Sequence, residues 1–161
     1  MNTSHLLDAL RYVTGLHVTS VSAEIGTLIA NVEVEDMATA TLRFNNGAMG
    51  SLIAGAHITG ANHAECCYIY GTEGQIRLPD PYSSNPLQIY LKRIWNEFTA
   101  GQWHSIVLEP VLVYQEAIED FARAVRTKGC IPVSAQDARE VLAIVLAIYQ
   151  SAAESRIITI S

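Results

Sequence analysis

The stretch that decides the fold is MATATLRFNNGAMGSLI, residues 37–53. Its first half places Ala38, Ala40, Leu42 and Phe44 on one face and Thr or Arg side chains on the other. This period of two is typical of a half-buried β-strand. Asn46-Gly47 follows, and this dipeptide predicts a type I′ hairpin turn because both central residues of that turn need a positive φ. We expect a partner strand over residues 48–58.

Other strands are predicted on both sides of this hairpin. Segments rich in Val, Ile, Thr and Tyr lie between turn residues and are typical of strands. Residues 94–104 give no clear pattern, and residues 105–108 fit an edge strand or a loop. The predicted strands cover residues 17–30, 65–70, 75–78, 87–92 and 156–161.

Three helices are expected, over residues 3–15, about 110–128 and 134–155. Ser134, followed three residues later by Asp137, predicts an acidic capping box at the start of the last one. That helix carries no charge between residues 140 and 154, which favours burial on most sides. The middle helix has an apolar stripe that we expect to be buried, formed by Leu112, Ile118, Phe121 and Val125.

These elements predict an α+β fold in a single domain spanning residues 1–161. We expect one open, mostly antiparallel sheet of about six to eight strands with helices packed on one face. The other face carries Thr, Ser, Ala and Gly with a few apolar residues. Such a flat, weakly polar face is suited to packing against a second sheet, so we expect a homo-oligomer.

Composition narrows the class of protein. Half of the 161 residues are hydrophobic and only 16% are charged, which excludes a disordered chain. No apolar run approaches the ~20 residues of a membrane span. The formal net charge of −6 argues against nucleic acid as a partner. The first residues show no secretory signal. Three cysteines without a CxxC spacing fit a reduced, cytoplasmic protein with no metal site.

Histidines supply the candidate site residues. The first predicted helix carries His5, Asp8 and Arg11 at a spacing of three residues, so the three side chains share a face. Such a face fits either proton-transfer chemistry or an ordinary helix surface. His57 and His63 flank a predicted loop and fit either a pocket or a solvated loop. Trp103 fits an aromatic wall for a sugar ring, or a loop folded onto the core or a partner. No dinucleotide fingerprint or P-loop is present.

Five segments, taken together, resemble the C-terminal domain of the Gfo/Idh/MocA oxidoreductases, the glucose–fructose oxidoreductase and inositol dehydrogenase family. The resemblance extends from His5 to Ile160. The segments are SHLLDALRYVTG (4–15), VEDMATATLRFNNGA (34–48), YGTEG (70–74), PVS (132–134) and IYQSA (148–152).

The resemblance implies a substrate-binding and oligomerisation domain of an NAD(P)-dependent sugar or polyol dehydrogenase. His5 matches the family's catalytic histidine, and Asn2 is implied to bind a neighbouring substrate hydroxyl. Met1 stands where the family usually has an Asp partner of this histidine. His63, and then His57 and Trp103, are expected to line the sugar pocket. Asp8 is expected to orient the helix or a loop.

The family's cofactor-binding Rossmann domain and its Glu-Lys-Pro lysine have no counterpart in these residues. We therefore expect no cofactor in this chain and no hydride transfer by it alone, with NAD(P) bound in a complete enzyme by the other domain. Three explanations of the missing Rossmann domain remain open: a truncated reading frame, a domain taken by itself, and a stand-alone remnant. The alternative function is a non-catalytic dimerisation or carbohydrate-binding module. An upstream coding sequence for a Rossmann fold would discriminate between these readings.

Overall fold

The computed structural model describes residues 3–56, 67–79, 85–107 and 112–160. They fall into two compact units: unit 1 comprises Met1–Ile58 and Cys130–Ser161, and unit 2 comprises Thr59–Gly129. The expected single domain over residues 1–161 stays a prediction.

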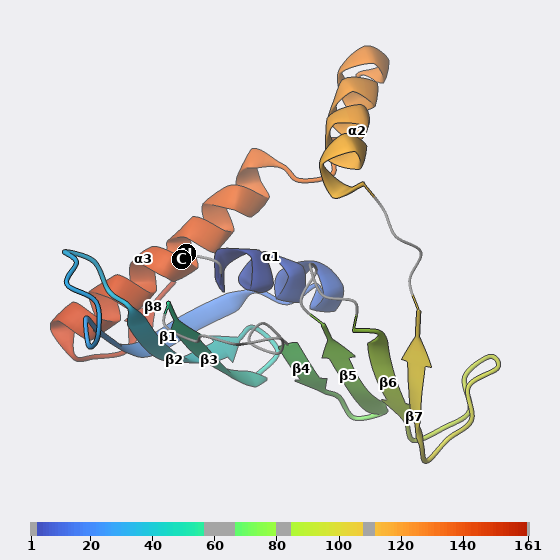
Figure 1. Ribbon diagram of the computed structural model, residues 1–161, viewed down its shortest axis with the longest axis horizontal. Coiled ribbons are helices and arrows are strands. Elements are labelled where there is room, and N and C mark those ends of the chain that lie inside the picture. The colour runs from blue at the N-terminus through green and yellow to red at the C-terminus, as the bar shows by residue number, and fades with distance from the viewer. Residues whose placement is uncertain (1–2, 57–66, 80–84, 108–111, 161) are drawn as a thin grey trace. The chain divides into compact units, whose positions relative to one another are not determined.

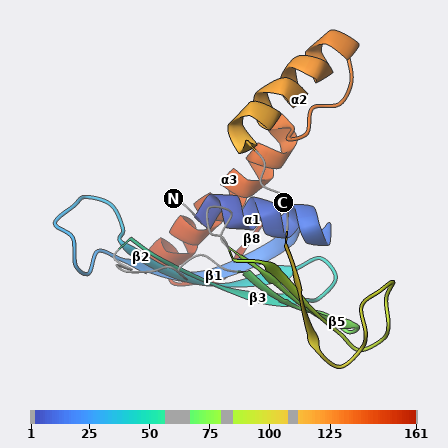
Figure 2. The same cartoon turned by 45° about the vertical axis from the view of Figure 1, so that its right-hand side comes forward.

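Unit 1 is built on a four-stranded antiparallel sheet, sheet A, in the order β3-β2-β1-β8. Helices α1 (Thr3–Thr14) and α3 (Ala135–Glu154) lie on the same face of this sheet (Figures 1 and 2). The α+β prediction is therefore confirmed. The strands of sheet A are β1 (Val18–Gly26), β2 (Met37–Phe44), β3 (Met49–Gly55) and β8 (Ile158–Thr159).

The β2–β3 hairpin forms where the sequence predicts it, but with a different turn. Phe44 N–H donates to the Ala48 carbonyl at 3.0 Å, so residues 45–47 form a three-residue loop. Gly47 has φ +88°, whereas Asn46 is not among the residues of positive φ. A type I turn followed by one left-handed residue matches this geometry, so the predicted type I′ turn is wrong.

The core of unit 1 lies between sheet A and α3. Alternate residues of β1 and β2 point into it, including Val21, Ala23, Ala40 and Leu42. They meet one stripe of α3, which comprises Val141, Ile144, Ala147 and Ile148. On its other side α3 exposes Leu142 and Leu146, at 55% and 58% of their surface. The expectation that this helix is buried on most sides is therefore wrong.

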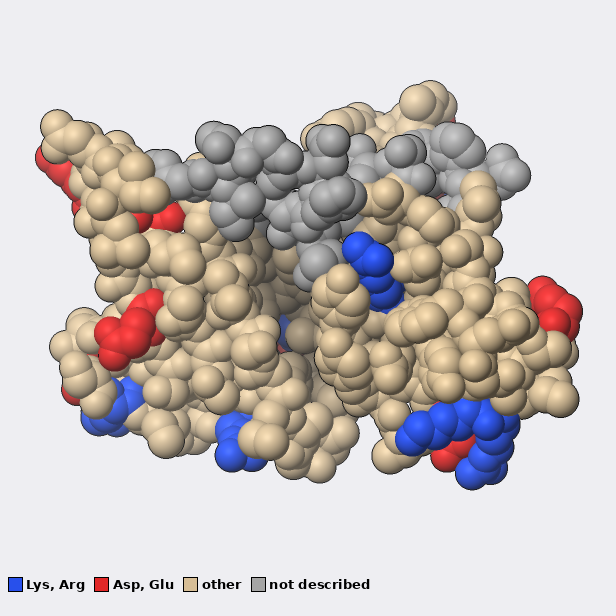
Figure 3. Space-filling view, turned by 60° about the horizontal axis from the view of Figure 1, so that its bottom comes forward, with Lys and Arg blue, Asp and Glu red and all other residues tan. Residues whose placement is uncertain are grey.

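The opposite face of sheet A is bare. Thr41 pairs with Ser22 and Ser51, and Thr39 pairs with Glu24 and Ile53. Of these side chains Ile53 is 70% exposed, so the face combines hydroxyl groups with aliphatic surface. Figure 3 brings the underside of Figure 1 forward, and most of the surface in view is uncharged.

Unit 2 contains a second four-stranded antiparallel sheet, sheet B, in the order β4-β5-β6-β7. The sequence predicts one sheet of six to eight strands, whereas the described strands form two sheets of four. Strand β7 begins in the segment of unclear pattern, at Trp103, and its second half lies in residues 105–108, where the sequence left an edge strand or a loop open. The strands of sheet B are β4 (Cys67–Tyr70), β5 (Gly74–Leu78), β6 (Leu87–Leu91) and β7 (Trp103–Ile106).

Helix α2 (Val113–Thr127) follows sheet B in unit 2. Its apolar stripe forms as the spacing predicts, but Ile118 and Phe121 are 70% and 58% exposed. Only Ala124 is buried on this helix. The expected burial of the stripe is wrong, because apolar periodicity specifies a face and not the surface that covers it.

Ser151 ties α3 to the sheet. Its side chain is 1% exposed, accepts a hydrogen bond from Ala23 N–H at 3.0 Å and donates one to the Arg156 carbonyl at 2.6 Å. Replacing it would leave a buried backbone donor without this partner.

We predict that Ser151→Ala lowers the free energy of unfolding by about 1–3 kcal/mol in urea denaturation. The matched control is Ser22→Ala on the bare face of sheet A, which should change it by less than about 0.5 kcal/mol. Equal effects of the two variants would contradict the role assigned to Ser151.

Candidate functional site

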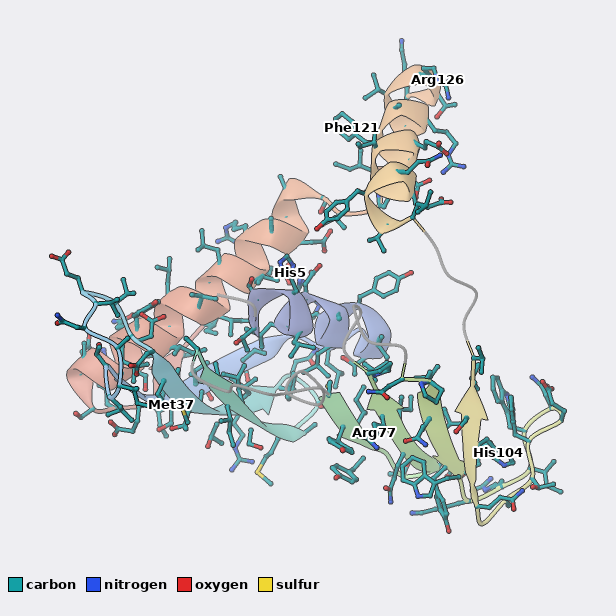
Figure 4. All side chains as sticks on the ribbon, in the orientation of Figure 1. His5, Met37, Arg77, His104, Phe121 and Arg126 are labelled. Atoms are coloured by element: carbon teal, nitrogen blue, oxygen red, sulfur yellow. The ribbon has the colours of Figure 1, made fainter. Side chains whose placement is uncertain are left out.

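The candidate site lies at the N-terminal turn of α1 in unit 1. His5 stands on this turn with an exposed side chain (Figure 4). The ring nitrogens of an exposed imidazole can form hydrogen bonds with a ligand. Asn2, His57 and His63, the other predicted site residues, lie outside the described residues. Trp103 lies on β7 in unit 2.

A small pocket opens beside the same turn, entirely within unit 1. Its polar rim comes from Thr3 and Ser4 of α1, Glu35 of the β1–β2 connection and Tyr149 of α3. Its floor is apolar and is formed by Leu7, Ile25, Ala38, Leu52, Ala54, Val145 and Ile148. This combination can hold a small ligand that has both hydroxyl groups and carbon surface.

A side-chain hydrogen bond joins Glu35 and Tyr149 at the rim. The Tyr149 hydroxyl donates to Glu35 Oε1 at 2.6 Å. This hydrogen bond, together with burial and the charge of Glu35, raises the pKa of Tyr149. The Tyr149 phenol therefore stays neutral, and the Glu35 carboxyl oxygens at the rim can accept hydrogen bonds from ligand hydroxyls.

Asp36 positions the connection that carries Glu35. Its carboxylate accepts hydrogen bonds from the N–H groups of Leu28, Ile29 and Ala30, at 2.7 to 2.8 Å. Asp36 is buried, and its own N–H donates to the Gly26 carbonyl. These bonds close the β1–β2 connection on itself, which fixes its last residues against the start of β2.

Arg11 holds α1 against α3. Its side chain is 8% exposed and forms a close ion pair with Glu140, and it donates to the Asp137 carbonyl at 3.3 Å. Asp8 lies 3.6 Å from the Arg11 guanidinium, and His17 lies 2.9 Å from the Glu140 carboxylate. The structure thus places Asp8 in this ion-pair cluster, consistent with the orienting role expected for it.

The N-terminus of α3 is held by its own capping box. Ser134 accepts from Asp137 N–H, and the Asp137 carboxylate accepts from Ser134 N–H. The predicted acidic capping box is confirmed. It lowers the pKa of Asp137, chiefly through the hydrogen bond from the Ser134 side chain.

Metal binding has no support in the described residues, where no cluster of three or more His, Cys, Asp or Glu side chains could hold an ion. Among the same residues, no helix is long and apolar enough to cross a membrane.

Known proteins resemble this chain in sequence and in fold. Residues 2–77 match the family model of the GFO/IDH/MocA C-terminal domain. Levoglucosan dehydrogenase, solved with NADH and L-sorbose, is 25% identical and superposes with a TM-score of 0.82 over 99% of this chain and 48% of its own. The resemblance to the Gfo/Idh/MocA C-terminal domain is confirmed.

Other solved structures share this fold. The WlbA dehydrogenase from Bordetella pertussis, solved with NADH and UDP-GlcNAcA, is 25% identical, with a TM-score of 0.76 over 99% of this chain and 44% of its own. Aldose-aldose oxidoreductase from Caulobacter crescentus is 20% identical, with a TM-score of 0.78 over 98% of this chain and 45% of its own. At this identity it supports the fold alone. The chain thus spans about half the length of these proteins. No curated protein matches it.

Sequence reasoning missed Glu35, Asp36 and Tyr149 as site residues. Glu35 and Tyr149 lie 114 positions apart in the sequence. The Val-Glu-Asp segment that carries Glu35 and Asp36 did contribute to the family resemblance. Spacing within one helix or strand contains no signal for a pair that only the fold brings together.

We predict that Glu140→Gln reduces the acid sensitivity of unfolding. The pKa of Glu140 is lowered from 4.5, chiefly by the hydrogen bond from Gln136, and further by His17 and Arg11. A carboxylate with a lowered pKa in the folded state stabilises the protein above its unfolded pKa, and this contribution is lost as the pH falls through the folded value.

The measurement is the free energy of unfolding from neutral pH down to about pH 3, with Glu24→Gln, on the exposed face of β1, as control. Glu140→Gln should be less stable than the wild type at pH 7 and lose less stability on acidification. Parallel pH profiles of the variant and the wild type would refute the role of this ion pair.

Proposed function

We propose that this chain is the substrate-binding and oligomerisation part of an NAD(P)-dependent sugar or polyol dehydrogenase. The observation that carries the proposal is the fit of 99% of the chain onto half of levoglucosan dehydrogenase, a protein also solved with NADH and levoglucosan. The pocket lined by Thr3 and Ser4, which neighbour His5 on α1, supports it, because its polar rim and apolar floor suit a polyhydroxylated ligand.

His5 is the proposed proton-transfer residue. It would accept or relay the proton of a substrate hydroxyl, while Glu35 accepts a hydrogen bond from a neighbouring hydroxyl. Asn2, His63 and His57 are proposed substrate-binding residues, following the family resemblance. The cytoplasm is the proposed location.

The N-terminus of α3 does not fit the pyrophosphate of a dinucleotide. The N-terminus of α3 is occupied by the Asp137 carboxylate, which would repel a pyrophosphate. The proposal therefore assigns the cofactor and the Glu-Lys-Pro lysine to a second domain of the complete enzyme. The chain by itself is proposed to be inactive in hydride transfer.

We predict that His5→Ala lowers kcat by about 10²- to 10⁴-fold, the range for loss of a general acid or base. The measurement uses this chain fused behind the N-terminal half of levoglucosan dehydrogenase, with levoglucosan as substrate and the unfused chain as the blank. Tyr12→Ala is the control, since Tyr12 lies on α1 and is 86% exposed. If the parent fusion is active and His5→Ala leaves kcat and KM unchanged, His5 is not part of the site.

Oligomerisation is proposed through the bare face of sheet A. Its Thr and Ser side chains are uncharged, the charges of Glu24 and Arg43 on the same face have opposite signs, and Met49 and Ile53 offer 66% and 70% of their surface for burial.

We predict a mass above the 17.6 kDa of one chain in light scattering at micromolar concentration. Thr41→Arg, at the centre of this face, should shift the protein to a monomer because two like charges would meet in a symmetric contact. Tyr12→Arg on α1 should leave the mass unchanged. A wild-type protein that is strictly monomeric would contradict this interface.

A further inference from the structure

The pocket beside the first turn of α1 has a single charged residue in its wall. Of the described residues that line it, Glu35 is charged, and the others are aliphatic or carry hydroxyl groups. No lysine, arginine or histidine is among these lining residues. Proteins bind the carboxylate groups of their ligands chiefly through such cationic side chains. The described wall of the pocket therefore lacks the group that an acidic ligand needs.

The arginines of α1 and α3 are placed away from this pocket or are already paired. Arg11 is 8% exposed and is engaged with Glu140 and Asp8. Arg139 lies on α3 about three turns before Tyr149. A carboxylate on a ligand would thus meet Glu35 without a compensating guanidinium from either helix.

Glu35 is held at the rim and does not turn away freely. Its Oε1 accepts a hydrogen bond from the Tyr149 hydroxyl at 2.6 Å. The next residue, Asp36, is buried and accepts hydrogen bonds from three backbone N–H groups of the same connection. If the Glu35 side chain moved away from a ligand, its hydrogen bond to Tyr149 would break. Repulsion between Glu35 and an acidic ligand would therefore persist in the bound state.

The Tyr149 hydroxyl offers a ligand an acceptor. A phenol has a single proton, and Tyr149 donates this proton to Glu35. The remaining hydrogen-bonding capacity of both side chains consists of oxygen lone pairs. A hydroxyl group of a ligand has a hydrogen to donate to them, whereas an ionised carboxylate has none. The pair thus selects by the direction of the hydrogen bond as well as by charge.

The aliphatic floor of the pocket strengthens this selection. It includes Leu7 and Ile148, which are 3% and 7% exposed. Charges beside such apolar surface are screened less than charges in bulk water. A carboxylate brought next to Glu35 would be repelled more strongly here than at an open surface, and a neutral hydroxymethyl group would not be repelled.

We propose that Glu35, held by Tyr149, is a specificity-determining residue that restricts the pocket to uncharged sugars and polyols and excludes the corresponding sugar acids. This inference rests on the proposed function for the chemical class of the ligand, and it adds the charge that the ligand must have. Tyr149 acts through Glu35 and is a positioning residue.

The test measures direct binding to this chain at neutral pH by saturation-transfer-difference NMR, which detects weak ligands. Two pairs of ligands are compared, D-glucose with D-glucuronate and D-glucitol with D-gluconate. In each pair the acid differs from the neutral member by one hydroxymethyl group that has become a carboxylate. The wild type should bind at least one neutral member about 10²-fold more tightly than its acid, the ratio expected for a like-charge contact.

Three variants assign this ratio to residues. Glu35→Gln keeps the size of the side chain and removes its charge, so it should lower the ratio by about tenfold or more. Glu33→Gln is the matched control, because it removes the same charge from an exposed position of the same connection, and it should leave the ratio unchanged. Tyr149→Phe frees the Glu35 side chain to turn away, so it should lower the ratio by less than Glu35→Gln does.

The proposal would be overturned by equal binding of the neutral and acidic members, by an unchanged ratio in Glu35→Gln, or by an equal change in Glu33→Gln. Failure of all four ligands to bind the folded chain would overturn it as well, because the pocket would then not be a site for sugars or polyols.

The proposed dehydrogenase function is tested separately, by the activity of the fusion and its loss in His5→Ala. A chain that keeps the binding ratio in an inactive fusion would support the role of Glu35 and contradict the dehydrogenase. An active fusion with an unchanged ratio in Glu35→Gln would support the dehydrogenase and overturn the role of Glu35.

Discussion

The buried guanidinium of Arg11 is the constraint on which the candidate site depends. An arginine with 8% of its side chain exposed must have anionic or carbonyl partners, and Glu140 and the Asp137 carbonyl provide them from α3. The position of α1 on α3 follows from this requirement. Because His5 and the pocket residues Thr3 and Ser4 stand one or two turns before Arg11 on the same helix, the ion pair also places the site.

Local patterns predicted most of the elements. Residues 37–44 alternate without a break and became β2 with these bounds, and Ser134 with Asp137 marked the start of α3. The resemblance named the fold correctly from five short segments. What these signals share is that each lies within one element and its immediate neighbours in sequence.

The wrong predictions have a different origin. Each of them concerns the distant segment that an element packs against or pairs with. The stripe on α2 was predicted, but its periodicity could not say whether anything covers it. The grouping of strands into two sheets depends on pairing between distant segments, and the turn at Gly47 depends on the register of the whole hairpin. Glu35 and Tyr149 meet only after β1, β2 and α3 have packed together, so neither residue stood out in the sequence.

The closed β1–β2 connection bears on how this fold can diversify. Asp36 and Gly26 join the two ends of the segment, and Thr27 donates to the Val34 carbonyl just inside them. Residues 31–33, between the N–H groups held by Asp36 and Val34, can change in number at little entropic cost, because lengthening a closed loop adds only slowly to that cost. Relatives could therefore remodel the border of the pocket, next to Glu35, without shifting a strand of sheet A.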